Sequence, residues 1–294
     1  MNADVVIQIV ASGLTLGAMY AVSTIGLSLV WGSLGMLNMA HGAMLTMGGY
    51  AAYFVMARLG LPHVAGLLGA MVVGAMVGLL VYHTVVRTML GSRSFDTNVI
   101  IATVGIASVL ENVVLKLFDA QPLPQPLVIG GSLQVGRVHI PNQNLLILGV
   151  ALVLMVAIAL VLQRSRAGRA IRATAMNREA AQLMGVPIGR VYAQVLMLAG
   201  ALAAVSGIMV SSIATLSPTM GGDPMLKAFI ICVVAGLGNV YGAVVSAIAL
   251  GLLEATAQYV IGVRFGFALL LFLVIAILIW RPYGLFGRRQ VVRL

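Results

Sequence analysis

The chain has 294 residues, of which 61% are hydrophobic and only 8% are charged, and its mean hydropathy is +1.10. An average soluble domain carries about 25% charged residues, so this composition excludes an ordinary soluble enzyme and a disordered chain, and the single cysteine, Cys232, excludes a disulfide scaffold. The 17 basic and 7 acidic residues give a net charge of +10, but the basic residues do not form a soluble face, which excludes nucleic acid as a partner.

The first uncharged segment runs from residue 5 to residue 57. It is more than twice as long as the roughly 20 residues that a helix needs to cross a bilayer. It therefore predicts two spans, near 5–30 and 36–57, with a turn at Trp31–Gly35. Further spans are predicted, in chain order, near residues 62–86, 97–118, 142–163, 191–213 and 265–281.

The segment at 225–261 is too long for one span and barely long enough for two. Gly236, Gly238 and Gly242 interrupt it, so we expect a short or broken helix followed by a full one. Residues 1–294 are therefore predicted to form a single all-α, polytopic membrane domain with about 8–9 transmembrane helices, some of them broken by glycine or re-entrant.

Two of the glycine-broken segments match each other at a constant offset of 200 residues. The matches are Leu37 with Leu237, Gly42 with Gly242, Ala43 with Ala243 and, less closely, Thr46 with Ser246. Identity as sparse as this also arises by chance. If it is real, the domain is an internal repeat of two halves, an arrangement that often marks a transport pathway.

Basic residues are concentrated in two places, the loop at 164–190 and the C-terminal tail. The loop contains six arginines and the tail contains four. Because Lys and Arg are retained on the cytoplasmic side of a membrane, both segments are predicted to be cytoplasmic. The segment at 119–141 and the N-terminus are predicted to lie outside, in the periplasm of a bacterial inner membrane, which requires an odd number of spans.

The loop at 164–190 contains a short helix whose two ends are marked in the sequence. Asn177 can cap the first turn, and Glu179 favours the positive N-terminal end of the helix. Gly185 suits the left-handed residue that follows a helix, and Pro187 prevents its continuation. We therefore expect a helix of about two turns.

This short helix has a small apolar face, formed by Ala180, Ala181, Leu183 and Met184. Two turns are marginal in water unless they pack against something, and the face is too small to be a core. Two interpretations are open: a partner protein covers the helix, or the helix rests on lipid head groups beside the arginines.

The loop also carries a recognisable motif, Glu179-Ala180-Ala181 followed after three residues by Gly185, which resembles the EAA loop of ABC importer permeases. Five further motifs are, in order, GLTLGAMYA (13–21), LNMAHG (37–42), MLKAF (225–229), GLGNVYGA (236–243) and RPYGLFG (281–287). Over residues 8–287 the ordered set resembles the LivH-type branched-chain amino-acid permease family. Ala235 and Tyr241 depart from the Gly and Pro of many members, which concerns only the local backbone of that turn.

The resemblance implies a permease that moves branched-chain or related amino acids from a periplasmic solute-binding protein into the cytoplasm by alternating access. It implies pairing with a second permease subunit, either a homologue or an identical copy, and two cytoplasmic ATPase subunits. These subunits would dock on Asn177, Glu179, Ala180, Ala181 and Gly185. ATP and Mg would bind to the ATPases, because this chain has no GxxxxGK[ST] phosphate loop. The chain is therefore expected not to be an enzyme and to bind no cofactor.

The sequence leaves other functions open as alternatives. Urea and short-amide permeases share much of the motif pattern, so they are alternative members of the same class. A self-contained channel or secondary carrier would need its own ion site, and the sequence has no paired carboxylates deep in a span and no Asn-Pro-Ala motif. It also has no residue pattern of an intramembrane protease.

Two carboxylates, Glu111 and Glu254, lie in the external third of predicted spans. A carboxylate that faces lipid costs about 2.5–3.5 kcal/mol on insertion scales, so both should point inward or toward a surface. They are candidates to line the external mouth of the pathway and meet an amino acid's ammonium group. Alternatively, Glu111 pairs with Lys116, and Glu254 pairs with Arg264 or with a neighbouring helix.

His41 lies beside the first glycine break, with Gly42 next to it and Asn38 three residues earlier, which we expect on the same helical face. A lone intramembrane His more often joins two helices than binds a ligand. The resemblance adds a role in the pathway or gate, and Gly238 and Asn239 are the equivalent candidates at the second break. No metal site is predicted, because no His has Cys or carboxylate partners at ligand spacing.

Overall fold

The computed structural model describes residues 3–90, 94–136 and 138–287. The elements in chain order are α1 (Ala3–Leu34), α2 (His41–Tyr53), the π-helical η1 (Phe54–Arg58), α3 (His63–Val81), the π-helical η2 (Tyr82–Val86), α4 (Arg87–Met89), α5 (Phe95–Phe118), β1 (Ser132–Val135), β2 (Val138–Pro141), α6 (Asn142–Arg164), α7 (Arg166–Met176), α8 (Arg178–Leu183), α9 (Ile188–Ile213), α10 (Gly222–Ala235), α11 (Val240–Val260) and α12 (Val263–Trp280).

Six helical segments in the described part of the chain are long and apolar enough to cross a membrane. They are α1, α3 with its continuation through η2 and α4, α5, α6, α9 and α11. The 14 residues of α10 are about 21 Å long, which is less than the roughly 30 Å of a hydrocarbon core. The predicted all-helical, polytopic class is confirmed, whereas the number of complete crossings stays a prediction.

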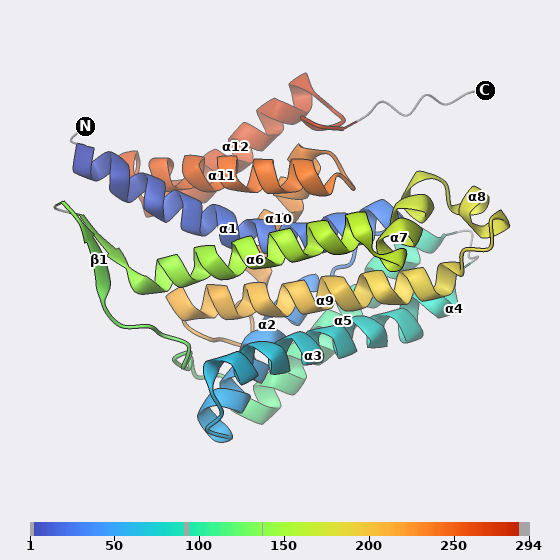
Figure 1. The fold of residues 1–294 in the computed structure, drawn as a ribbon, viewed down its shortest axis with the longest axis horizontal. Coiled ribbons are helices and arrows are strands. Elements are labelled where there is room, and N and C mark those ends of the chain that lie inside the picture. The colour runs from blue at the N-terminus through green and yellow to red at the C-terminus, as the bar shows by residue number, and fades with distance from the viewer. Residues whose placement is uncertain (1–2, 91–93, 137, 288–294) are drawn as a thin grey trace.

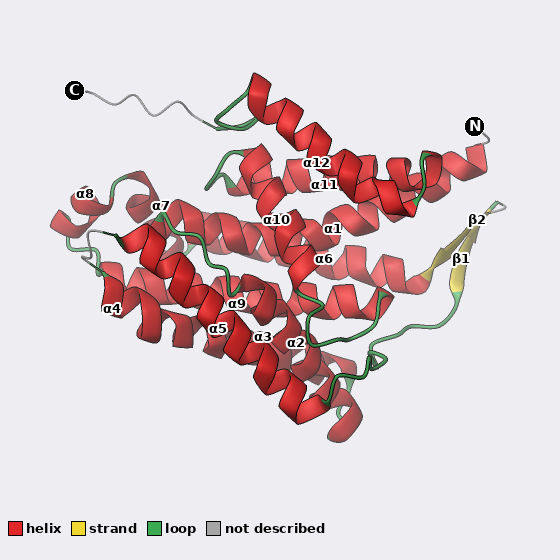
Figure 2. Cartoon of the chain, turned by 180° about the vertical axis from the view of Figure 1, so that it is seen from behind, coloured by secondary structure: helices red, strands yellow, loops and turns green. Residues whose placement is uncertain are grey.

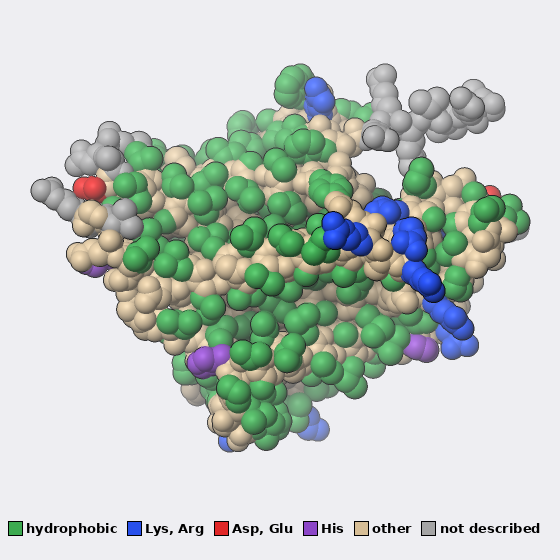
Figure 3. Space-filling view, viewed as in Figure 1, with side chains coloured by type: hydrophobic (Ala, Val, Ile, Leu, Met, Phe, Trp, Pro, Cys, Tyr) green, Lys and Arg blue, Asp and Glu red, His purple; other side chains and the backbone are tan. Residues whose placement is uncertain are grey.

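The long helices lie side by side along the longest axis of the molecule (Figure 1). The N-terminus of α1 and the β1–β2 hairpin lie at one end of the bundle, and α7 and α8 lie at the other end, as the reverse view also shows (Figure 2). On the face that Figure 3 shows, hydrophobic side chains are spread along the length of the bundle, and Lys and Arg side chains gather near the end that carries α7 and α8. The helix axes therefore run along the expected membrane normal.

The core is centred on α1, which packs most extensively against α11 and also contacts α9, α6 and α10. A second extensive contact joins α3 to α9. Glycine permits the close approach of α9 to α2, because a Cβ on Gly207 would meet the backbone carbonyl of Leu45. Small residues at helix contacts of this kind are typical of membrane proteins, where backbones approach closely to gain packing.

The first predicted hairpin differs from the structure in its turn. The predicted turn at Trp31–Gly35 is helical up to Leu34, and the chain reverses after Gly35, whose φ is 68°. The next helix begins only at His41. Asn38 therefore lies in the link between helices, where its Oδ1 accepts a hydrogen bond from the Ala40 amide at 3.1 Å. The prediction that Asn38 and His41 share a helical face is wrong.

The second glycine-broken segment agrees with its prediction. The short helix α10 ends at Ala235, and the full-length helix α11 begins at Val240. Gly236 and Gly238, with φ of 95° and 85°, form the turn between them. Ala235, which stands where many members of the family have Gly, is the last residue of α10. The two-half repeat stays a prediction.

Two features of the fold, a β-hairpin and a helix, are not predicted from the sequence. The hairpin of β1 and β2 lies in the segment expected outside the membrane, and its register pairs Ser132 with Pro141. The helix α7 lies in the arginine-rich loop, where the sequence indicated only the helix that follows it. The arginines of α7 lower the mean hydropathy of the segment, but Arg and Ala both favour helix, so the segment is helical without being an apolar span.

Candidate functional site

The arginine-rich loop is built from two helices that meet at Asn177. The Ser165 hydroxyl accepts a hydrogen bond from the Gly168 amide at 2.8 Å and caps α7. Asn177 ends α7 and caps α8, because its Oδ1 accepts a hydrogen bond from the Ala180 amide at 2.9 Å. Gly185 has a φ of 82° after the last turn of α8. The predicted cap and the predicted left-handed glycine are both confirmed.

The predicted apolar face of α8 is divided between the interior and the surface. Ala181 is only 5% exposed and faces its own chain. Leu183 and Met184 are 89% and 85% exposed, so they point away from the rest of the molecule. Glu179 and Ala180 are exposed as well. The loop thus presents two large apolar side chains at the end of a capped helix.

The short helix is held against the bundle by its first residue. The guanidinium of Arg178 lies 5.6 Å from the centroid of the Tyr192 ring in α9, a cation–π geometry. The backbone of α8 therefore has fixed attachments at both its cap and its first turn.

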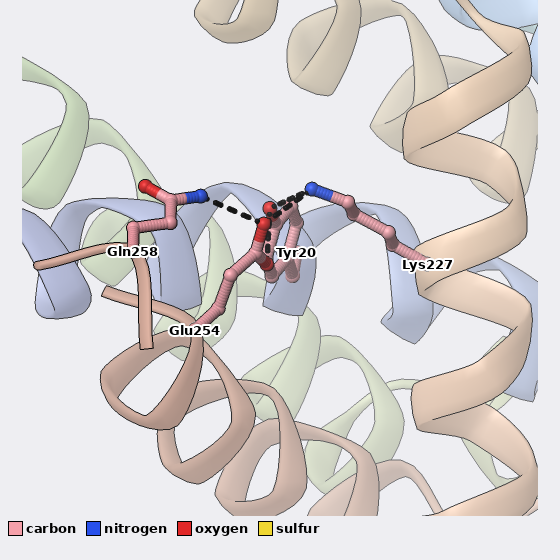
Figure 4. A network of polar contacts seen from close by, with 4 residues as sticks. All are labelled: Tyr20, Lys227, Glu254 and Gln258. Atoms are coloured by element: carbon pink, nitrogen blue, oxygen red, sulfur yellow. Dashed lines mark hydrogen bonds and ion pairs between the residues drawn. The ribbon is translucent and has the colours of Figure 1, made fainter. Parts of the chain in front are cut away.

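A buried polar network joins α1, α10 and α11 (Figure 4). The Nζ of Lys227 in α10 lies 2.6 Å from Oε1 of Glu254 in α11, and their side chains are 18% and 1% exposed. The Tyr20 hydroxyl in α1 donates to Glu254 at 2.8 Å and accepts from Lys227 at 2.9 Å. Gln258 donates its side-chain amide to Glu254 at 3.1 Å. The ring of Phe267 in α12 lies 5.9 Å from the ammonium group.

The prediction that Glu254 pairs with a neighbouring helix is confirmed by Lys227. The other predicted partner, Arg264, has its side chain outside the described part of the structure. Lys227 is not among the site residues predicted from the sequence, although it lies in a helix that is largely apolar. A lysine in such a position is itself a signal, because an intramembrane charge requires a partner.

The pairing predicted for Glu111 is wrong. Among the described residues, Lys227–Glu254 is the only salt bridge, so Lys116 does not neutralise Glu111. Glu111 is half-buried on α5. Glu111 lies on α5, which packs mainly against α2, and Glu254 lies on α11, which packs mainly against α1, so the structure does not bring the two predicted carboxylates into one site.

His41 lies at the start of α2 and is fully buried. Its Nε2 is 3.2 Å from the Ser23 hydroxyl of α1, so it joins two helices as the simpler prediction required. Gly42 lies directly against the backbone of Gly221, where an added Cβ would be 2.9 Å from the carbonyl oxygen. These residues hold the helix start in place, and their part in a gate stays a prediction.

The remaining two candidates lie at the turn between α10 and α11. Asn239 caps α11 through a 3.0 Å bond from the Gly242 amide, and it donates to the Phe286 carbonyl at 3.1 Å. Gly238 lies next to Gly32 of α1, whose Cα would be 2.9 Å from an added Cβ. Both residues line a cavity of about 480 Å³. The structure therefore places the candidate pathway residues at four separate positions: the start of α2, Glu111 on α5, Glu254 on α11 and the α10–α11 turn.

The long apolar helices, the basic loop and its capped helix define a polytopic permease of the ABC transporter class. Over residues 9–279 the chain matches the sequence profile of the family described as branched-chain amino acid transport system / permease component, and it belongs to this family.

Named relatives extend over nearly the whole chain. The high-affinity branched-chain amino acid transport system permease protein LivH of Escherichia coli is 28% identical, over 97% of this chain and 96% of its own length. The corresponding protein BraD of Pseudomonas aeruginosa is 29% identical over 97% of both chains. A probable permease of this kind from Methanocaldococcus jannaschii is 27% identical over 90% of this chain.

Proposed function

We propose that this chain is the membrane permease of an importer that carries branched-chain amino acids into the cytoplasm by alternating access. The cargo is supported by the names of the E. coli and P. aeruginosa relatives, which match nearly the whole chain. The observation that carries the mechanism is the exposure of Leu183 and Met184 on α8. Exposed apolar side chains on a short, capped helix are stabilised when a partner covers them.

The partner on α8 is a cytoplasmic ATPase subunit, with one such subunit for each of two permeases. ATP and Mg bind to these subunits, which perform the hydrolysis. The coupling residues are those of the capped helix, Asn177, Glu179, Ala180, Ala181 and Gly185. Closure of the ATPases moves α8, and the Arg178–Tyr192 contact passes this movement to α9. Nucleotide and cargo shift the equilibrium only through contacts that differ between its two states.

The arginine-rich end of the bundle is the cytoplasmic end, because basic residues are retained there. The β1–β2 hairpin and the N-terminus then lie in the periplasm, where a solute-binding protein delivers the amino acid. The second permease subunit is a homologue of this chain. The pathway runs between the two permeases, and Glu254 lies nearer its periplasmic side.

The proposal is tested by replacing Gly185 with aspartate. A non-glycine residue in the left-handed conformation costs about 1–2 kcal/mol, and an aspartate at a helix C-terminus opposes the helix dipole. We expect Gly185→Asp to lose both ATPase co-purification and leucine uptake, because α8 no longer has its docking geometry. Co-purification from membranes and uptake of labelled leucine are measured together, with labelled urea as the comparison cargo.

The matched control is Gly60→Asp. Gly60 has a φ of 66°, and, as at Gly185, an added Cβ meets nothing within 4 Å. The two substitutions carry similar backbone strain, but Gly60 lies far along the chain from α8. If Gly185→Asp retains ATPase binding and uptake, the coupling role of α8 is wrong. Uptake of urea in place of leucine would contradict the cargo alone.

A further inference from the structure

A cavity of about 480 Å³ lies where α1 ends and α11 begins. The walls come from α1, α6, α7, the α10–α11 turn and the segment after α12. Since α6 ends at Arg164 and α11 begins at Val240, the cavity lies at the level where spans leave the hydrocarbon core. This is the depth of lipid head groups if the bundle spans the membrane along its axis.

The cavity is basic, and no acidic side chain among the described residues neutralises its charge. Arg172 of α7 lines it, and Arg166 and Arg169 are exposed on the same helix. Within the described ranges the only salt bridge is Lys227–Glu254, so no carboxylate lies within 4.0 Å of Arg172. Figure 3 shows Lys and Arg side chains gathered at this end of the molecule, beside a hydrophobic surface. An anion is the ligand that fits this charge.

The walls contain both apolar and polar side chains. Leu29, Leu162, Ile171 and Val240 line it, together with the hydroxyl-bearing side chains of Ser28, Ser33 and Tyr241. The Tyr241 hydroxyl accepts a hydrogen bond from the Gln163 amide at 2.8 Å, which leaves its own proton available to donate. Tyr241 is also 60% exposed, so it lies at the rim of the cavity. Free phosphate has no apolar group that could contact the apolar side chains of the cavity, whereas a lipid has acyl chains that could.

We propose that this cavity binds the phosphate head group of an anionic phospholipid. Arg172 pairs with the phosphodiester, the Tyr241 hydroxyl donates to it, and an acyl chain follows the apolar surface at Leu237 and Val240. Basic pockets between transmembrane helices on the cytoplasmic side are suited to anionic head groups, and an Arg–phosphate pair is a strong, charge-assisted contact. The bound lipid joins α7, which continues into α8, to the start of α11.

The test uses the purified permease complex with its partner subunits, titrated with phosphatidylglycerol and, separately, with phosphatidylcholine. Bound lipid is counted by native mass spectrometry. Arg172→Gln is expected to weaken phosphatidylglycerol binding about tenfold, since a charged hydrogen-bonded pair is lost. Tyr241→Phe should weaken it less, and phosphatidylcholine binding should not change. Inorganic phosphate at millimolar concentration should not displace the lipid.

The matched control is Arg190→Gln, which removes the same charge from an exposed arginine of the same loop that does not line the cavity. It should leave phosphatidylglycerol affinity within about twofold of the unsubstituted protein. All three variants should have unchanged unfolding midpoints without lipid, because Arg172, Arg190 and Tyr241 are exposed. Equal losses in Arg172→Gln and Arg190→Gln would overturn the site in favour of diffuse surface charge. Displacement by inorganic phosphate would overturn the lipid as ligand, and unchanged binding in both Arg172→Gln and Tyr241→Phe would overturn the cavity.

Discussion

Glu254 is a buried carboxylate that is stabilised by a basic residue in another helix. Its ion pair with Lys227 is almost excluded from solvent, and Tyr20 and Gln258 occupy further hydrogen-bonding positions on the carboxylate. A buried pair contributes little net stability compared with apolar residues of the same size, whereas removal of one partner costs about 3–5 kcal/mol. The network therefore constrains which substitutions the α10–α11 contact tolerates.

Replacement of Lys227 by methionine should destabilise the protein strongly, because Glu254 then remains buried without its counter-charge. The double variant Lys227→Met with Glu254→Leu should recover most of this loss, since neither charge remains. Thermal unfolding in detergent measures both variants. Equal destabilisation in the single and double variants would contradict the interpretation that the loss comes from an uncompensated charge. Leucine uptake by a stable double variant then tells whether the pair also serves transport.

At the residue scale, the sequence predicts the residues that cap and end a helix, but it does not predict which two residues pair across helices. The Asn177 cap and the left-handed Gly185 depend only on a few neighbouring residues, so the sequence was sufficient. The Lys227–Glu254 pair depends on how α10 packs against α11. The sequence indicated that Glu254 required a partner, but the choice of Lys227 depends on tertiary structure.

At the scale of elements, glycine sets how closely two helices approach. The contact of α9 with α2 leaves no space for a side chain at Gly207, because a Cβ there would meet the Leu45 carbonyl. Gly149 in α6 is the opposite case, as an added Cβ would meet nothing within 4 Å. The same residue type thus has two different roles within spanning helices.

Gly207→Val should lower the yield of folded protein, because α9 and α2 must separate and lose packing along their contact. Overpacking of this kind typically costs about 1–3 kcal/mol. Gly149→Val should have little effect, as its side chain enters the lipid-facing surface. The two variants are compared by size-exclusion profile and thermal unfolding. Similar behaviour of both would contradict a close α2–α9 contact.

Hydropathy predicted the long spans because each is a continuous apolar segment. It could not predict α7, whose arginines lie on the exposed side while Gly168, Ile171 and Thr174 are buried against the bundle. It also placed the first turn too early, because Trp31 and its neighbours are compatible with helix up to the positive-φ glycine, Gly35. The positions of amphipathic helices and of helix ends depend on packing more than on mean hydropathy.

On the scale of the whole molecule, the charge distribution gives the bundle two different ends. The basic end carries α7 and α8, and the other end carries the N-terminus and the hairpin (Figures 1 and 3). An importer requires this asymmetry, because its ATPases and its solute-binding protein act on opposite sides of the membrane. The orientation proposed from the arginines is therefore the orientation that the proposed function requires.

Orientation can be measured with single cysteines and a membrane-impermeant maleimide. The native Cys232 is buried, so the unsubstituted chain should give no labelling and serves as the control. Met176→Cys, at an 88% exposed position beside α8, should react only after the membrane is permeabilised, whereas Gln134→Cys in the hairpin should react in spheroplasts with an intact membrane. The reason is that the arginines near Met176 are retained inside. The reverse pattern would place the coupling helix on the side without ATP, and the importer mechanism would then be untenable.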